Sequence, residues 1–189
     1  MKIDSKISII IIATTIIVLV IIIVFFKRIK QSALGMITDN YFTISELCRS
    51  TKAKENNIDN TPTPEAEANL VALRDNILNP TRRLLGSCIY INSGYRCPEL
   101  NALVGGVITS QHVTGEAADL DTRSLAKNRR LFEILVGLGN FDQLIWEGQG
   151  EWIHVSYKSN GYNRGEILAQ NLTKTGYVNI KNSWQTYIA

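Results

Sequence analysis

The strongest constraint on how this chain can fold is a long apolar run close to its N-terminus. Residues 7–26 are apolar except for Ser8, Thr14 and Thr15. A helix needs about 20 such residues to cross a bilayer. No face of the segment is polar and β-branched Ile and Val dominate it, so it fits poorly as a core helix of a globular domain. We therefore expect one transmembrane helix.

Basic residues flank the apolar run on both sides. Lys27, Arg28 and Lys30 follow it where a cleavable signal peptide would need small residues, so we expect an uncleaved, single-pass anchor over residues 1–30. Lys2 and Lys6 precede it, and this near balance leaves the membrane orientation open. These residues explain part of the net charge of +3 and suit anionic lipids. We predict contact with the lipid bilayer through residues 7–26 and no nucleic-acid binding.

The rest of the chain has room for one ordinary domain. We expect a polar tether over residues 31–40, a folded domain over residues 41–157, and a C-terminal tail, residues 158–189, to which we assign no role. The three cysteines, Cys48, Cys88 and Cys97, lack the C-x-x-C spacing of a zinc knuckle. Cys88 and Cys97 would pair only in an oxidising compartment, and buried thiols are favoured instead. The oligomeric state is left open.

Hydrophobic periodicity predicts an α+β domain in which helices pack a mostly antiparallel sheet. Thr43 and Glu46 form a capping-box pattern, and Thr63 precedes a second helix that starts at Pro64. Residues 51–64 have the composition of a surface loop. The other predicted helices cover residues 98–103 and 125–138. Strands are predicted over residues 89–92, 117–121, 141–147 and 152–157, with a turn over residues 148–150.

The chain contains two histidines, His112 and His154. His112 lies in SQHVTGEAADL, where Gly115 permits a tight turn and Asp119 begins an apolar strand. His154 lies in the predicted strand segment EWIHVSY. Two imidazoles and a carboxylate suffice for a catalytic zinc site, which leaves a fourth position for water, whereas calcium and magnesium prefer oxygen ligands. A histidine taken alone is more often a capping or core residue than a metal ligand, so these residues by themselves only suggest zinc.

Four segments occur in an order that resembles the zinc D-alanyl-D-alanine carboxypeptidase family: SGYRCPELNALVGG, SQHVTGEAADL, FDQLIWE and EWIHVS. That family includes peptidoglycan carboxypeptidases, vancomycin-resistance dipeptidases and phage endolysins. Its fold is shared with the signalling domain of hedgehog proteins. The resemblance extends over about residues 41–157, and it implies a hedgehog-like or D,D-peptidase-like fold.

The resemblance implies one Zn²⁺ per chain. The S-x-H-x-x-G-x-A-x-D motif of the family is complete from Ser110 to Asp119, and it assigns His112 and Asp119 as ligands. The third ligand of the family corresponds to His154. The motif also puts Ser110 and Gln111 beside the metal, where they either contact substrate or make hydrogen bonds within the turn.

The resemblance further implies two catalytic residues, Glu151 as general base and Arg96 as electrostatic stabiliser. Glu151 precedes His154 by three positions, so a regular strand would turn the two side chains to opposite faces. Glu147 and Asp142 are therefore retained as alternative bases. A structural ion pair is the alternative role for Arg96.

The function implied is that of a membrane-tethered zinc metallopeptidase whose domain faces the cell wall, encoded by a bacterium or a phage. Its substrate would be the stem or cross-link peptides of peptidoglycan, cleaved as a D,D-carboxypeptidase or as an endopeptidase. A non-hydrolytic zinc-bearing binding module and a phage lysis or tail component are the alternatives.

Overall fold

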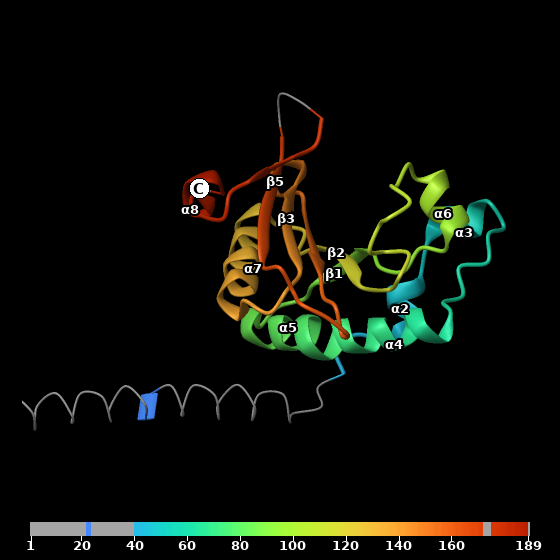
Figure 1. The fold of residues 1–189 in the computed structure, drawn as a ribbon, viewed down its shortest axis with the longest axis horizontal. Helices are drawn as coiled ribbons and strands as arrows, with labels where there is room; N and C mark the ends of the chain where they lie inside the picture. The colour runs from blue at the N-terminus through green and yellow to red at the C-terminus, as the bar shows by residue number, and fades with distance from the viewer. Residues whose placement is uncertain (1–21, 24–39, 172–174, 189) are drawn as a thin grey trace, which may run out of the picture. The chain divides into compact units, whose positions relative to one another are not determined.

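The computed structural model describes residues 22–23, 40–171 and 175–188. From Asn40 onward the described residues form an α+β domain around a six-stranded sheet with strand order β1-β2-β4-β3-β5-β6 (Figure 1). All neighbouring strands are antiparallel except β3 and β5, which are parallel. The predicted fold class, α+β with a mostly antiparallel sheet, is confirmed.

The bounds of the elements are as follows. The strands are β1 (Tyr90–Ser93), β2 (Ala117–Asp121), β3 (Gln143–Glu147), β4 (Trp152–Ser156), β5 (Glu166–Gln170) and β6 (Tyr177–Asn179). The helices are α2 (Ile44–Cys48), α3 (Thr51–Glu55), α4 (Pro64–Leu73), α5 (Asn79–Leu85), α6 (Pro98–Leu103), α7 (Leu125–Leu138) and α8 (Trp184–Tyr187). A π-helical turn η1 (Arg74–Leu78) joins α4 to α5, and a 3₁₀ turn η2 (Gly148–Gly150) joins β3 to β4.

Local capping explains where the main helices begin and end. The hydroxyl of Thr43 accepts a hydrogen bond from the backbone N–H of Glu46 at 3.1 Å, and the hydroxyl of Thr63 does the same for Ala66 at 3.2 Å. Gly139 takes a left-handed φ of 69° after α7, which has the predicted bounds. Helix starts at residues 44 and 64 therefore follow from short-range chemistry.

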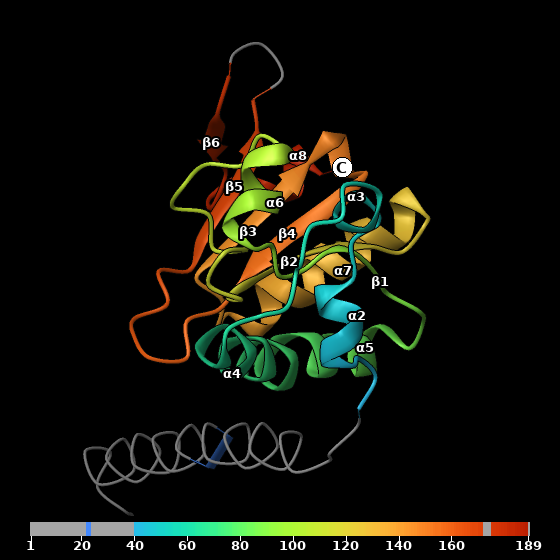
Figure 2. The same ribbon diagram turned by 90° about the vertical axis from the view of Figure 1, so that its right-hand side faces the viewer.

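The core lies between one face of the sheet and α7, behind β2 and β4 in Figure 2, and it continues among buried residues of α2, α4 and η1. Alternate residues of the central strands, such as Leu120, Ile153 and Leu144, are fully buried. The rings of Phe132 in α7 and Trp146 in β3 meet in a T-shaped contact, with centroids 5.4 Å apart. The opposite face of the same strands is thereby free to carry polar side chains.

Two predictions made from local composition were wrong in part. The expected loop over residues 51–64 contains α3, because Ser50 caps it through the N–H of Ala53 and Ala53 is buried. The expectation of buried thiols fails for Cys88, which is exposed, whereas Cys97 is buried and Cys48 is half-buried. All three cysteines are free.

Residues 158–189, set apart above as a tail, contribute two strands to the sheet. β5 pairs in parallel with β3, and β6 pairs with β5. Ile167 and Ala169 of β5 are buried in the core cluster. Residues 167–169 are three consecutive apolar residues between Glu166 and Gln170, a run too short to distinguish a strand from other buried segments by periodicity alone.

Within the described ranges, no helix has the length and apolar character needed to span a membrane. The predicted anchor over residues 7–26 lies outside those ranges, apart from Ile22 and Ile23. It stays a prediction.

Candidate metal centre

Strand register brings two of the predicted ligands together. Asp119 of β2 lies directly opposite His154 of β4, and His154 lies opposite Ile145 of β3. Directly opposite residues in an antiparallel pair project from the same face. The flanking Leu120 and Ile153 are buried on the other face, so the core dictates that Asp119 and His154 point away from it.

His112 reaches the same spot from a turn that precedes β2. Gly115 in this turn has a φ of +73°, and a Cβ atom there would lie 2.2 Å from the carbonyl oxygen of Ala66. Only glycine fits such a conformation and such a close approach to the backbone of α4. The turn therefore packs tightly, and His112 is 3% exposed.

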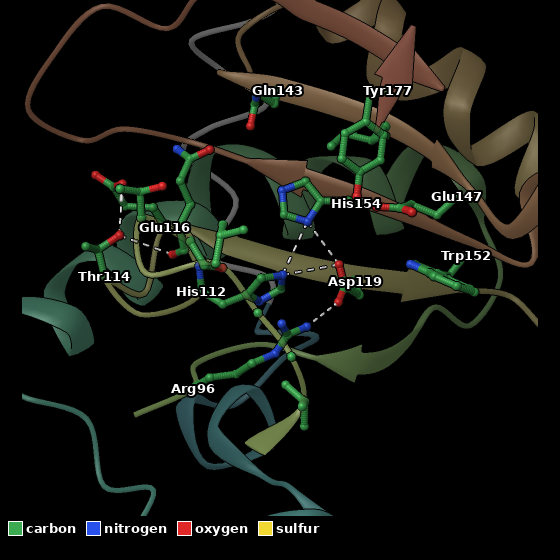
Figure 3. A pocket seen from close by; sticks show the side chains of 18 of the residues that line it. Arg96, His112, Thr114, Glu116, Asp119, Gln143, Glu147, Trp152, His154 and Tyr177 are labelled. Carbon is green, nitrogen blue, oxygen red and sulfur yellow. Dashed lines mark hydrogen bonds and ion pairs between the residues drawn. The ribbon is translucent and has the colours of Figure 1, made fainter. Parts of the chain in front are cut away.

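The three donor atoms form a compact triangle (Figure 3). Nδ1 of His154 lies 3.0 Å from Oδ1 of Asp119 and 3.3 Å from Nε2 of His112. Nε2 of His112 lies 3.3 Å from the same Asp119 oxygen. Ligand bonds of about 2.0–2.1 Å in a tetrahedron around zinc give ligand separations of about 3.3 Å. The triangle thus matches three corners of a zinc tetrahedron, and these residues could hold a metal ion.

Partners behind the triangle orient its members. The carbonyl of Gly94 accepts a hydrogen bond from Nδ1 of His112 at 2.7 Å. The proton is thus on Nδ1, and the lone pair of Nε2 is available to a metal ion. Arg96 donates to Oδ2 of Asp119 at 2.8 Å and to the hydroxyl of Ser93 at 2.7 Å. Such outer partners are typical of metal ligands.

The surroundings of Asp119 favour the ionised form of its carboxyl group. Burial alone would raise its pKa, but the charges and hydrogen bonds of His112 and His154 hold the pKa well below its usual range. A donor set of two imidazole nitrogens and one carboxylate oxygen is that of a catalytic zinc site.

The triangle lies in a pocket of about 900 Å³. Its lining includes Arg96, Ser110 and Gln111 from the predicted site, and also Glu147 and Tyr177. Val104 and Val107 line it from the loop that follows α6. A pocket of this size accommodates a peptide segment next to the metal group.

The two candidate bases on the β3–β4 hairpin differ in position. Glu147 lines the pocket, whereas Glu151 is exposed and is not part of the lining. Glu147 lies opposite Trp152, two residues along the ladder from the Ile145 and His154 pair, so it shares the face of His154. Glu151 follows η2 in a helical conformation, before β4 begins.

The surroundings of Glu147 suit proton transfer. Its side chain is 8% exposed, and its Oε1 accepts a hydrogen bond from the Tyr177 hydroxyl at 3.0 Å. Burial raises the pKa of Glu147, and the hydrogen bond from Tyr177 acts in the opposite direction. A carboxyl group with a raised pKa is a better proton acceptor than one in water.

Asp142, the other alternative base, is fully buried and has a structural role. Arg164 donates to it at 2.9 Å through Nε, and Gln111 donates to it at 3.1 Å. Burial by itself would raise its pKa, but the hydrogen bonds of Arg164 lower it overall. Asp142 therefore fastens the segment next to His112. Arg164 and Tyr177 were missed because both lie beyond residue 157.

Comparison with known families identifies the one to which this chain belongs. A family model described as Peptidase M15 matches residues 40–156. No curated protein matches the chain. The matched range contains the three candidate ligands, Arg96 and Glu147, and it ends before β5 begins.

Proposed function

We propose that this chain, which belongs to the peptidase M15 family, is a zinc metallopeptidase that hydrolyses amide bonds in the peptide part of peptidoglycan. The observation that carries the proposal is the triangle of His112, Asp119 and His154, with separations suited to zinc, in a peptide-sized pocket. The peptidoglycan substrate rests on the resemblance of the motifs and not on the pocket.

His112, Asp119 and His154 would hold the zinc ion. When bound, zinc acts as a Lewis acid that polarises a carbonyl group and makes water nucleophilic near neutral pH. The hydrogen bond from His112 to Gly94 and the ion pair of Arg96 with Asp119 keep the ligand atoms turned toward one point.

Glu147 is the residue we propose as general base, in preference to Glu151. Its carboxylate would accept a proton from the attacking water and deliver it to the leaving nitrogen. Pocket lining, burial and a shared sheet face with His154 support this choice. Arg96 also lines the pocket and would oppose the negative charge that develops on the carbonyl oxygen.

The charges of the pocket favour cleavage of an internal bond. Among the described lining residues, the Lys and Arg side chains are Arg96, Lys158 and Arg164, and each lies within 4 Å of a carboxylate. A free C-terminal carboxylate of a substrate would have to compete with Asp119 or Asp142 for them. Endopeptidase action on cross-link peptides is therefore our preferred form, and D,D-carboxypeptidase action is the alternative.

The predicted anchor completes the proposal for location. A single-pass helix over residues 7–26 would hold the domain at the membrane, facing the cell wall. A phage lysis or tail component would use the same site. A non-hydrolytic zinc-bearing module is the less favoured alternative, because such a module needs no proton acceptor in its metal pocket and Glu147 lines this pocket.

Hydrolysis of cross-linked wall peptides by the zinc-loaded protein, followed by mass spectrometry, tests the proposal. We expect cleavage that stops on zinc chelation, returns on zinc addition and is absent in His154→Ala. Zinc analysis should give about one ion per chain for the parent protein and a loss in His154→Ala. A protein that holds zinc and cleaves neither cross-linked nor linear wall peptides would be a binding module instead.

A further inference from the structure

Tyr177 belongs to β6, outside the part of the chain that the family model matches. Its hydroxyl nevertheless donates to Oε1 of Glu147 at 3.0 Å, and the residue lines the pocket. Figure 3 shows the ring reaching toward Glu147 beside His154, on the far side of the metal triangle from Arg96. A segment remote in sequence thus contacts the proposed base.

Strand alternation explains why Tyr177 points this way. Tyr177 pairs with Gln170 of β5, and β5 runs parallel to β3 with Ile145 opposite Leu168. Ile167 and Ala169 face the core, so Leu168 and Gln170 face the pocket side. Tyr177, directly opposite Gln170, projects from the same face, close to the C-terminal end of β3.

The environment of Tyr177 is that of a site residue and not of a core residue. The residue is 53% exposed, so packing does not account for its position. Burial of the hydroxyl and the nearby charge of Glu147 raise its pKa to about 12. The phenol therefore keeps its proton at neutral pH and can donate a hydrogen bond to the Glu147 carboxylate.

We infer that Tyr177 is a positioning residue for the proposed reaction, which holds the Glu147 carboxylate in place through its hydroxyl. The inference rests on the proposed function of Glu147 as base. A carboxylate anchored by one oxygen has the other oxygen free to face the attacking water. The β5–β6 hairpin is thereby part of the site, although it lies beyond the matched range.

The experiment compares Tyr177→Phe with Tyr162→Phe in the zinc-loaded protein. Tyr162 is 82% exposed and is not part of the pocket lining, so it is a matched control. Tyr177→Phe should lower kcat roughly 10-fold with little change in KM, because one hydrogen bond to a charged group is lost. Zinc content and melting temperature should stay the same.

The pH dependence of kcat/KM distinguishes a positioning role of Tyr177 from a purely structural role. The hydrogen bond favours the ionised form of Glu147, so its loss should move the acid limb of kcat/KM to higher pH in Tyr177→Phe. Tyr162→Phe should keep the parental profile. A parental rate and profile in Tyr177→Phe would overturn the inference.

A second measurement does not depend on hydrolysis. In protein with labelled tyrosine rings, the NMR signal of the ring carbon that bears the Tyr177 hydroxyl should move as Glu147 titrates. That movement should vanish in Glu147→Gln. A signal that ignores this substitution would show that the contact is absent and would also overturn the inference. If the contact is present but no variant or parent hydrolyses wall peptides, the proposed function fails instead.

Discussion

The ion pair between Arg96 and Asp119 gives the two carboxylate oxygens of Asp119 different roles. The guanidinium holds Oδ2 at 2.8 Å, while Oδ1 lies 3.0 Å from Nδ1 of His154 and faces both imidazoles. One oxygen is thus held by Arg96, and the other is available as a ligand for a metal ion. The structural ion pair that was the alternative role for Arg96 is present, and the same side chain also lines the pocket.

Arg96→Lys should weaken zinc binding about 10- to 100-fold, the usual effect of losing an outer partner of a ligand. A lysine ammonium cannot hold Ser93 and Asp119 in the fork geometry of a guanidinium. Competition with a chromophoric chelator measures the affinity. Arg123→Lys is the control. Arg123 is exposed and forms an ion pair with Asp121, which belongs to the same strand as Asp119. Equal affinities of the two variants would contradict the role given to Arg96.

Glu147→Gln and Glu151→Gln together decide which carboxylate is the base. Glu147→Gln should retain zinc and lose about 100- to 10,000-fold in turnover, because the proton acceptor is gone. Glu151→Gln should retain most of the turnover, since its side chain is outside the pocket lining. Single-turnover rates on cross-linked wall peptides measure both. The reverse pattern would return the base to Glu151.

Gly115→Ala should destabilise the protein by about 2 kcal/mol or more. The φ of +73° disfavours any side chain, and the added Cβ would meet the carbonyl of Ala66 at 2.2 Å. Gly137→Ala in α7 is the matched control, because nothing lies within 4 Å of its added Cβ. It should stabilise the protein by about 0.5–1 kcal/mol. Urea unfolding of the metal-free proteins measures both free energies.

Asp142→Asn should cost about 1–3 kcal/mol of unfolding free energy, because Arg164 would lose one of its two ionised partners, Asp142 and Glu166. The partial exposure of Arg164 keeps the cost below that of a fully buried pair. The folded pKa of Asp142 is lowered, so its ionised form stabilises the protein above about pH 4 and this contribution is lost as the pH falls further. Denaturant melts of parent and variant should therefore converge at acid pH. A difference independent of pH would exclude the ion pair as its cause.

The anchor prediction concerns residues outside the described ranges. Full-length protein should partition into the detergent phase, whereas protein starting at Gln31 should stay in the aqueous phase and fold, because we expect the apolar run to bind the membrane and not the domain core. Phase separation followed by blotting measures the distribution. Aqueous full-length protein would refute the anchor.

Features that depend on short-range patterns could be predicted from the sequence. Capping residues marked the starts of α2 and α4, and periodicity marked α7 and the central strands. The set of His112, Asp119 and His154 was also readable, because the chain has two histidines and each lies in a family motif. That resemblance is confirmed by the family match.

Which acidic residue of the β3–β4 hairpin lines the metal pocket depends on tertiary contacts. The family resemblance implied Glu151, although its three-residue spacing from His154 argued against a shared strand face. Which acidic residue lies near His154 in space depends on how the β3–β4 hairpin pairs. That pairing puts Glu147 on the pocket face, while Glu151 is left in the turn. Tyr177 was equally invisible, because its contact with Glu147 spans 30 residues and requires the parallel pairing of β5 with β3. Sheet register depends on how the buried faces of paired strands match and on the geometry of the turns between them, so it is not read from one strand alone.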